Sequence, residues 1–298
     1  MEIILTIFTP TFNREETLIR LYKSLANQTL KNFEWLVIDD GSTDDTENLI
    51  SNFIKENKIP IQYFKQENLG KQAAWNCAVK ISDKKYFLGV DSDDVLYGNE
   101  TIKDIFSKYI HRLDESKKLI ALRGLAFSTA KNGYSAKKIS SKDMVEESWL
   151  KEIKYNSVGD RSDIWLTSVL KSFLYPVGDN IKFIPELWLY ASLSELEYNF
   201  IYINEPVIRI YDNHNNNRLS RASLQKNATG QYLARIKLIQ SVPFYIWFYN
   251  FPYLIKNLIR YSQFANYLKI SFKLRLRDVG IIYTLFSYLF LPFNIGMK

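Results

Sequence analysis

The segment Tyr86-Phe87-Leu88-Gly89-Val90-Asp91-Ser92-Asp93-Asp94 decides how the rest of the chain is interpreted. Its first five residues are mostly apolar and bulky, as in a strand buried in a parallel sheet. The strand leads directly into three carboxylates within four residues, which repel one another unless a cation lies among them. Oxygen ligands of this kind suit Mg²⁺ or Mn²⁺. For this segment alone, a surface turn that caps the next helix is the alternative.

Strands and helices alternate in the chain that precedes this segment. We predict strands at residues 2–8, 33–38 and 61–65, and helices at residues 14–28, 44–55 and 71–81. Alternation with short loops predicts a mostly parallel α/β sheet with helices on its faces. Ligands bind at the carboxyl ends of strands in such sheets. Four strand ends therefore deliver polar residues to one edge, at Thr9, Asp39–Asp40, Asn68 and Asp91–Asp94.

The stretch from residue 101 to residue 225 has a mixed pattern. We predict strands at 121–128 and 201–210, and helices at 104–114, 164–173 and 187–196. Residues 131–142 form a polar hairpin or loop, and residues 159–163 form a polar loop before a helix.

Charge and cysteine usage exclude several classes of function. The single Cys77 excludes an internal disulfide and a cysteine-based metal cluster, and the two histidines leave little room for a histidine-rich zinc site. The net charge is +7, but residues 235–298 alone carry nine Lys/Arg and one acid. The remainder of the chain is therefore not basic, and a nucleic-acid-binding main domain has no electrostatic support.

Residues 226–298 differ in composition from the rest and form a helical, basic and aromatic-rich tail. Sixteen aromatic residues occur between residues 235 and 298. The apolar run Ile281–Phe293 is too short to span a bilayer with ease, and Met1-Glu2 lacks the basic start of a secretory signal. Basic residues beside aromatic amphipathic helices fit association with a membrane surface. A helical cap on the domain or on a partner chain is the alternative.

Four motifs together resemble a known family. They are Thr9-Pro10-Thr11-Phe12-Asn13-Arg14, Val37-Ile38-Asp39-Asp40-Gly41-Ser42-Thr43-Asp44-Asp45-Thr46, Asn68-Leu69-Gly70-Lys71 and Asp91-Ser92-Asp93-Asp94. Their order and rough spacing resemble the inverting glycosyltransferases of family 2, which have the GT-A fold. Residues 183–186 and 204–211 look like the acceptor half of bacterial members that build surface polysaccharides. The resemblance implies a GT-A domain at 1–225, with a nucleotide-sugar-binding half at 1–100 and an acceptor half at 101–225.

The resemblance also implies roles for individual residues. A UDP-sugar is the expected donor, and Mn²⁺ or Mg²⁺ the expected cofactor. Asp40, or Asp39 as the alternative, would accept a hydrogen bond from the uracil N3–H. Asp93 would hold the metal on the diphosphate, with Asp94 and His214 as further candidate ligands. The complete set of residues implied for nucleotide-sugar binding is Thr9, Pro10, Asp40, Lys71, Asp91 and Ser92.

An inverting transferase needs a carboxylate that deprotonates the acceptor hydroxyl. Glu186, which follows Pro185 and opens an apolar helix, matches the family position best. Leu187 follows it, where the family often has an Asp. Asp163 is the second candidate. A carboxylate is also favoured at a helix start for electrostatic reasons alone, so the structural alternative for Glu186 stays open.

The resemblance thus implies an inverting glycosyltransferase in cell-surface polysaccharide synthesis. Its acceptor would be a glycan or lipid-linked glycan, and it would lie at the cytoplasmic face of the cell membrane. A sugar nucleotidyltransferase is the alternative enzyme, but Thr9–Glu16 contains no glycine for its expected phosphate loop. A non-catalytic, membrane-associated scaffold is the third possibility, against which the intact carboxylate cluster counts.

Overall fold

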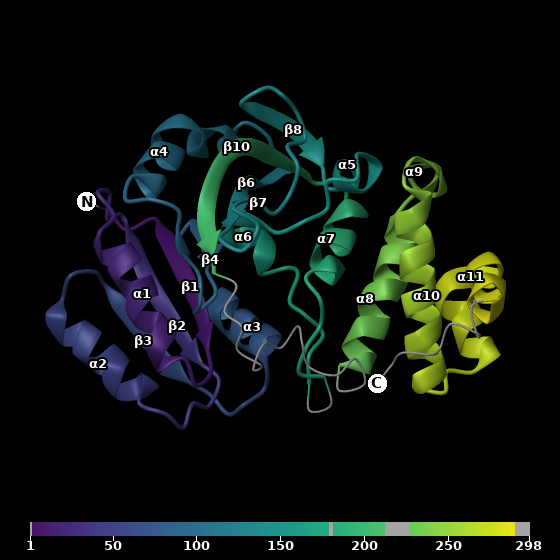
Figure 1. Ribbon diagram of the computed structural model, residues 1–298, viewed down its shortest axis with the longest axis horizontal. Coiled ribbons are helices and arrows are strands. Elements are labelled where there is room, and N and C mark those ends of the chain that lie inside the picture. The colour runs from purple at the N-terminus through teal and green to yellow at the C-terminus, as the bar shows by residue number, and fades with distance from the viewer. Residues whose placement is uncertain (1, 179–180, 212–226, 290–298) are drawn as a thin grey trace. The chain divides into compact units, whose positions relative to one another are not determined.

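The computed structural model describes residues 2–178, 181–211 and 227–289 (Figure 1). The chain divides into two compact units, each built from separate segments. The first unit contains Met1–Glu147, Ser157–Leu174 and Asn199–Asn213. The second contains Ser148–Asn156, Tyr175–Tyr198 and His214–Lys298, so it includes two segments that precede the tail in the sequence.

The first unit is built on a ten-stranded mixed sheet. Its main strand order is β3-β2-β1-β4-β9-β6-β10-β5, with β7 beside β6 and β8 beside β10. The strands are β1 Leu5–Thr11, β2 Phe33–Asp39, β3 Ile61–Lys65, β4 Tyr86–Gly89, β5 Val95–Leu96, β6 Leu119–Ser128, β7 Gly133–Tyr134, β8 Met144–Ser148, β9 Arg161–Leu166 and β10 Asn199–Ile210.

Parallel pairing confirms the α/β fold expected from the sequence. Strand β1 pairs in parallel with β2 and β4, β2 pairs in parallel with β3, and β6 pairs in parallel with β10. Strand β9 runs antiparallel to both β4 and β6. The helices of this unit are α1 Glu15–Ala26, α2 Thr46–Glu56, α3 Lys71–Ile81, α4 Thr101–Lys108 and α6 Thr167–Leu170, with a 3₁₀ helix at Ile110–Asp114.

The prediction of a helix at residues 164–173 is wrong. Arg161–Leu166 forms strand β9, and only Thr167–Leu170 is helical. Ile164 and Trp165 are buried, in a strand hydrogen-bonded between β4 and β6. A short apolar run that is buried on both faces lacks the alternation that separates a strand from a helix, so the periodicity alone could not decide.

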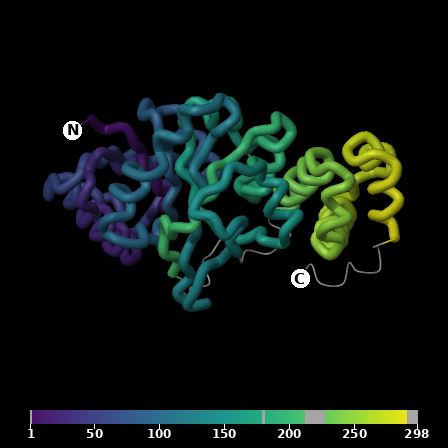
Figure 2. Tube along the Cα trace, turned by 90° about the horizontal axis from the view of Figure 1, so that it is seen from above, coloured from purple at the N-terminus to yellow at the C-terminus, as the bar shows by residue number. Residues whose placement is uncertain are grey.

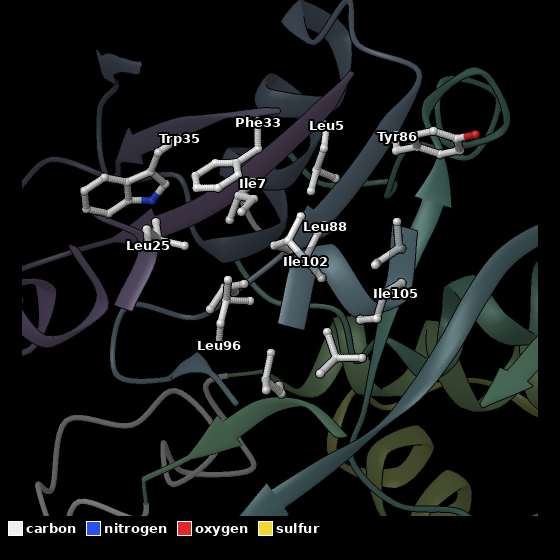
Figure 3. Packing of buried hydrophobic residues seen from close by; sticks show 14 of the residues in the cluster. Leu5, Ile7, Leu25, Phe33, Trp35, Tyr86, Leu88, Leu96, Ile102 and Ile105 are labelled. Carbon is white, nitrogen blue, oxygen red and sulfur yellow. The ribbon is translucent and has the colours of Figure 1, made fainter. Parts of the chain in front are cut away.

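Alternate residues of the central strands form the core of the first unit. Figure 3 shows Leu5 and Ile7 of β1, Phe33 and Trp35 of β2, and Tyr86 and Leu88 of β4 among one group of side chains, together with residues of α1, α4 and β5. All of these are nearly or fully buried. Every second residue of a strand lies on the same face, so this packing fixes the strand register and, with it, the position of each strand end.

The second unit is helical. Its helices are α5 Leu150–Lys154, α7 Leu187–Ser194, α8 Ala228–Ser241, α9 Phe244–Tyr249, α10 Phe251–Tyr267 and α11 Phe272–Leu289, the last four drawn in green to yellow (Figures 1 and 2). Tyr232 of α8 stacks on Tyr261 of α10, with ring centroids 5.5 Å apart. Gly280, at φ 75°, interrupts α11. Among the residues described, none of the helices has the length and apolar character needed to cross a bilayer.

Candidate active site

Three carboxylates meet in the turn after β4. Strand β4 is parallel to β1, and Val90 N–H donates to the Phe8 carbonyl at 2.9 Å, so the turn begins at the carboxyl edge of the sheet. Asp94 N–H donates to the Asp91 carbonyl at 3.0 Å and closes the turn. One carboxylate oxygen from each of Asp91, Asp93 and Asp94 lies within 4.8 Å of the others. We call this group the acidic turn.

Asp94 is the buried carboxylate of the acidic turn. It is 7% exposed, and one of its oxygens accepts a hydrogen bond from Tyr211 N–H at 3.2 Å. Burial, followed by the charges of Asp91 and Asp93, raises the pKa of Asp94 to about 8. A nearby cation would favour the ionised carboxylate and reverse this shift.

The acidic turn therefore fits a divalent cation by the chemistry of its donors. Hard carboxylate oxygens that converge from one short turn suit Mg²⁺ or Mn²⁺, which share their remaining coordination positions with phosphate oxygens. The burial of Asp94 beside the charges of Asp91 and Asp93, which raises its pKa, supports the same assignment.

Lys71 contributes a positive charge beside the three carboxylates. It is the first residue of α3, and its ammonium lies 2.8 Å from Asp91 Oδ1. The pair is partly exposed, with 24% of the Lys71 side chain and 46% of the Asp91 side chain accessible. Two residues predicted to contact the nucleotide-sugar donor therefore lie together, Lys71 at the start of α3 and Asp91 in the turn after β4.

Asp40 organises the loop that presents Lys71. Its carboxylate accepts hydrogen bonds of 2.8 Å from three donors, the Gln66 side-chain amide and the backbone N–H groups of Leu69 and Gly70. Gly41, at φ 86°, allows the close approach of the two loops, because a Cβ there would lie 3.1 Å from Asn68 N. Asp40 thus connects the end of β2 to the start of α3, a role that the sequence motif did not reveal.

The remaining residues predicted to bind the nucleotide-sugar are less accessible to solvent. Thr9 is fully buried, and its hydroxyl accepts a hydrogen bond from the Trp35 indole at 2.9 Å, so other residues form the surface of this edge. Ser92 is 7% exposed, whereas Pro10 is half-buried. Asp39 is fully buried and accepts hydrogen bonds from Ser42 N–H and the Tyr63 hydroxyl, each at 2.7 Å.

The two candidate bases have contrasting surroundings. Asp163 is buried in β9 and forms an ion pair of 2.5 Å with Arg123 of β6. Glu186 is exposed and stands at the N-terminal end of α7, in the second unit. His214 lies outside the described residues.

Sequence reasoning missed Arg20. This residue of α1 donates to the Asp93 carbonyl at 2.5 Å, and its guanidinium lies over the Tyr211 ring, 3.8 Å from the centroid. No motif contains Arg20. It is one basic residue among several on an amphipathic helix, and only the three-dimensional structure brings it to the acidic turn.

Comparisons with known proteins agree with this fold. The family model of glycosyl transferase family 2 matches residues 6–114. An uncharacterized glycosyltransferase of Rickettsia bellii is 42% identical over 95 residues, which are 32% of this chain and 14% of that protein. The first three relatives, all from Rickettsia, are matched over only 14 to 15% of their own length.

Two Staphylococcus aureus proteins are similar over much more of the chain. The poly(ribitol-phosphate) beta-N-acetylglucosaminyltransferase TarP is 26% identical over 256 residues, which are 80% of this chain and 73% of TarP. The crystal structure of TarS 1-349 in complex with UDP-GlcNAc superposes with a TM-score of 0.64 and 20% identity, and it covers 100% of this chain and 81% of that one.

The mixed sheet, its helices and the acidic turn at the carboxyl edge define a GT-A fold, the fold of nucleotide-sugar-dependent glycosyltransferases. Residues 6–114 form a glycosyltransferase family 2 domain, since the family model matches this part of the chain.

Proposed function

We propose that the protein is a metal-dependent, inverting glycosyltransferase that uses a UDP-sugar. The observation that carries the proposal is the convergence of Asp91, Asp93 and Asp94 within 4.8 Å at the carboxyl edge of a family 2 domain. UDP-GlcNAc is the first donor to test, since TarS was crystallised with it and TarP is named for the same sugar. The proposed acceptor is a hydroxyl of a glycan or lipid-linked glycan in cell-surface polysaccharide synthesis.

Each group of the donor site has a proposed role. Asp93 holds Mg²⁺ or Mn²⁺, with Asp91 or Asp94 as a further ligand. The metal, when bound, stabilises the charge that builds on the departing diphosphate. Lys71 contacts the diphosphate or the base once the donor displaces it from Asp91, and Asp40 acts by holding the loop that carries Lys71. Asp91 and Pro10 face the nucleoside.

Glu186 is our proposed general base. In the proposed reaction the acceptor oxygen attacks the anomeric carbon, the bond from that carbon to the diphosphate oxygen breaks, and the hydroxyl proton passes to the Glu186 carboxylate. Accessibility favours Glu186 over Asp163, because Glu186 is exposed whereas the Asp163 side chain is only 4% accessible and is paired with Arg123.

The decisive experiment is a calorimetric titration with UDP, with and without Mn²⁺. We expect binding that requires the metal and is lost in Asp93→Asn. Asp83→Asn is the matched control, because Asp83 is an exposed carboxylate just before β4 that pairs with Lys84. Metal-independent binding, or an unaffected Asp93→Asn variant, would refute the proposed metal site. Loss of UDP binding in Asp83→Asn as well would indicate a general effect of charge.

We further propose that one corner of the second unit contacts an anionic membrane surface. Five aromatic side chains on or beside α9 are 57–73% exposed, and we call them the aromatic patch: Phe244, Tyr245, Phe248, Tyr249 and Phe251. Lys154 of α5 lies 4.2 Å from the Tyr249 ring centroid. The one acid of α5, Glu152, is fully buried.

This composition favours a lipid interface over a second copy of the chain. Aromatic side chains and lysines are enriched where a protein meets lipid headgroups, and each nearby lysine gains attraction from anionic lipids. An isologous dimer through this corner would bring like charges together, since Lys151 and Lys154 would both lie at the interface. The charge of the corner therefore complements a membrane rather than itself.

Vesicle flotation tests this assignment. The double variant Phe244→Ser/Phe248→Ser should float less with vesicles that contain phosphatidylglycerol, and Lys154→Gln should weaken flotation in low salt only. Ile19→Ser, an exposed apolar residue of α1, is the control. Equal flotation of all variants would refute the assignment, and binding to a soluble anionic polymer but not to vesicles would indicate an acceptor site instead.

A further inference from the structure

Three contacts link helix α1, the acidic turn and the end of strand β10. Arg20 Nη2 donates to the Asp93 carbonyl at 2.5 Å. The same guanidinium lies over the ring of Tyr211, with 3.8 Å from Cζ to the ring centroid. Tyr211 N–H donates to Asp94 Oδ1 at 3.2 Å. The contacts form a closed ring through Arg20, Asp93, Asp94 and Tyr211, all within the first unit.

This ring acts on the main chain of the acidic turn. Asp91, Asp93 and Asp94 repel one another, and the repulsion favours opening of the turn when no cation is present. Arg20 holds the peptide carbonyl between Asp93 and Asp94, while the Tyr211 N–H holds one oxygen of Asp94. Both contacts leave the Asp93 carboxylate outside the ring, and they restrain the backbone that positions it.

Arginine is suited to this position in a way that lysine is not. A guanidinium is planar, so it can stack its face on an aromatic ring while an edge N–H donates in the plane. Lysine would keep the positive charge near the carboxylates but would lose the combination of stacking and directed donation. The substitution Arg20→Lys therefore separates a long-range effect of charge from positioning.

We propose that Arg20 and Tyr211 are a positioning pair that holds the acidic turn in its cation-binding geometry. The proposal rests on the proposed function, since it gives the turn a metal and a diphosphate to bind. Neither residue touches the reacting atoms in this assignment. Their effect on the donor passes through the backbone of Asp93 and the carboxylate of Asp94.

Binding of Mn²⁺ alone, followed by electron paramagnetic resonance, tests the pair directly. Removing the stacked cation in Arg20→Gln should weaken Mn²⁺ binding about fivefold to tenfold, and Arg20→Lys should resemble Arg20→Gln. Tyr211→Phe keeps the ring and the backbone N–H, so it should bind as the wild type does. Lys23→Gln is the charge control, because Lys23 is exposed on the same helix.

A double-mutant cycle distinguishes a positioning pair from two independent structural residues. Tyr211→Ala should weaken Mn²⁺ binding, and Arg20→Gln/Tyr211→Ala should be no weaker than the more damaged single variant, because either change breaks the same ring. Additive losses, or an Arg20→Gln variant with wild-type Mn²⁺ affinity, would overturn the proposal.

UDP titration separates this proposal from the proposed function. If the wild type binds Mn²⁺ but not UDP, and Arg20→Gln weakens Mn²⁺ binding, the positioning pair stands and the donor assignment fails. If the wild type binds no Mn²⁺, both fail. If Mn²⁺ and UDP bind and both weaken in Arg20→Gln, both are supported.

Discussion

Lys71 Nζ lies 2.8 Å from Asp91 Oδ1 and 2.9 Å from Asp91 Oδ2, so the lysine contacts both oxygens of the carboxylate. The pair joins the start of α3 to the turn after β4. The positive charge of Lys71 repels a metal ion but attracts a diphosphate. The two ligands should therefore respond to the loss of Lys71 in opposite directions.

Substitution Lys71→Met should raise the affinity for Mn²⁺ alone about fivefold, because it removes a positive charge and releases Asp91. The same change should lower the affinity for UDP in the presence of Mn²⁺. Calorimetry measures both, with Lys80→Met, an exposed lysine of the same helix, as the control. Parallel changes in the two affinities would contradict the assigned contact with the diphosphate.

The pKa of Asp94 predicts how stability depends on pH. Its folded value of about 8 lies above its ordinary value of 3.8, so the folded protein holds a proton that the unfolded chain releases. Metal-free stability should therefore fall as the pH rises from about 4 to about 8, and Asp94→Asn should flatten this dependence. Thermal unfolding in a chelating buffer measures the effect.

Added Mn²⁺ supplies the control for that prediction. It should raise the melting temperature of the wild type more near pH 8 than near pH 5, because the cation competes with the proton for Asp94. The gain should shrink in Asp94→Asn. If the difference in melting temperature between the wild type and Asp94→Asn does not change with pH, the raised pKa assigned to Asp94 is excluded.

Asp163 and Glu186 should differ in what their loss affects. Asp163→Asn leaves the Arg123 guanidinium buried without its ionic partner, and breaking a buried pair costs about 3–5 kcal/mol. Glu186→Gln changes an exposed residue, so the melting temperature should hold while kcat falls about 10²-fold or more.

Thermal unfolding and turnover of the two variants test this contrast, and Asp114→Asn, from the exposed pair with Lys85, sets the scale for loss of a surface pair. A stable Asp163→Asn protein with lost turnover and intact UDP binding would make Asp163 the base.

Gly230 in helix α8 is a packing requirement of the second unit. A Cβ at this position would lie 1.8 Å from the Phe183 carbonyl oxygen, so Gly230→Ala forces α8 away from the segment before α7. We expect a loss of at least about 1–3 kcal/mol in the free energy of unfolding. Gly178→Ala is the matched control, since nothing lies within 4 Å of its added Cβ. Equal stability of the two variants would contradict the packing.

The N-terminal half of the fold was predictable because its signals are local. The apolar run Trp35–Ile38 predicts a buried strand and lies buried in β2, and the helix predicted at residues 71–81 is α3. Their strand and helix ends place Asp40, Lys71 and the acidic turn at one edge. The helix prediction at residues 164–173 was wrong because the burial of residues 161–166 depends on two strands, β4 and β6, that are distant in sequence.

The site was predictable in its residue types but not in its contacts. Asp40 and Thr9 lie where the motifs put them, yet their side chains bind the Leu69 backbone and the Trp35 indole. A motif records that a residue is needed and not which neighbour it binds. Arg20 lies in no motif and reaches Asp93 across 73 positions, so periodicity could not identify it.

The short strand β5 has a consequence for folding. It follows the acidic turn directly, and its residues Val95 and Leu96 pair with Arg209 and Ile208 of β10. The downstream end of the turn is thus fixed by a partner more than a hundred residues later in the chain, a contact of high sequence separation that forms slowly. During synthesis, Asp94 gains its Tyr211 hydrogen bond only after β10 has been made. The cation site should therefore mature late, and a growing or truncated chain that ends before Ile210 should present the motif without the geometry.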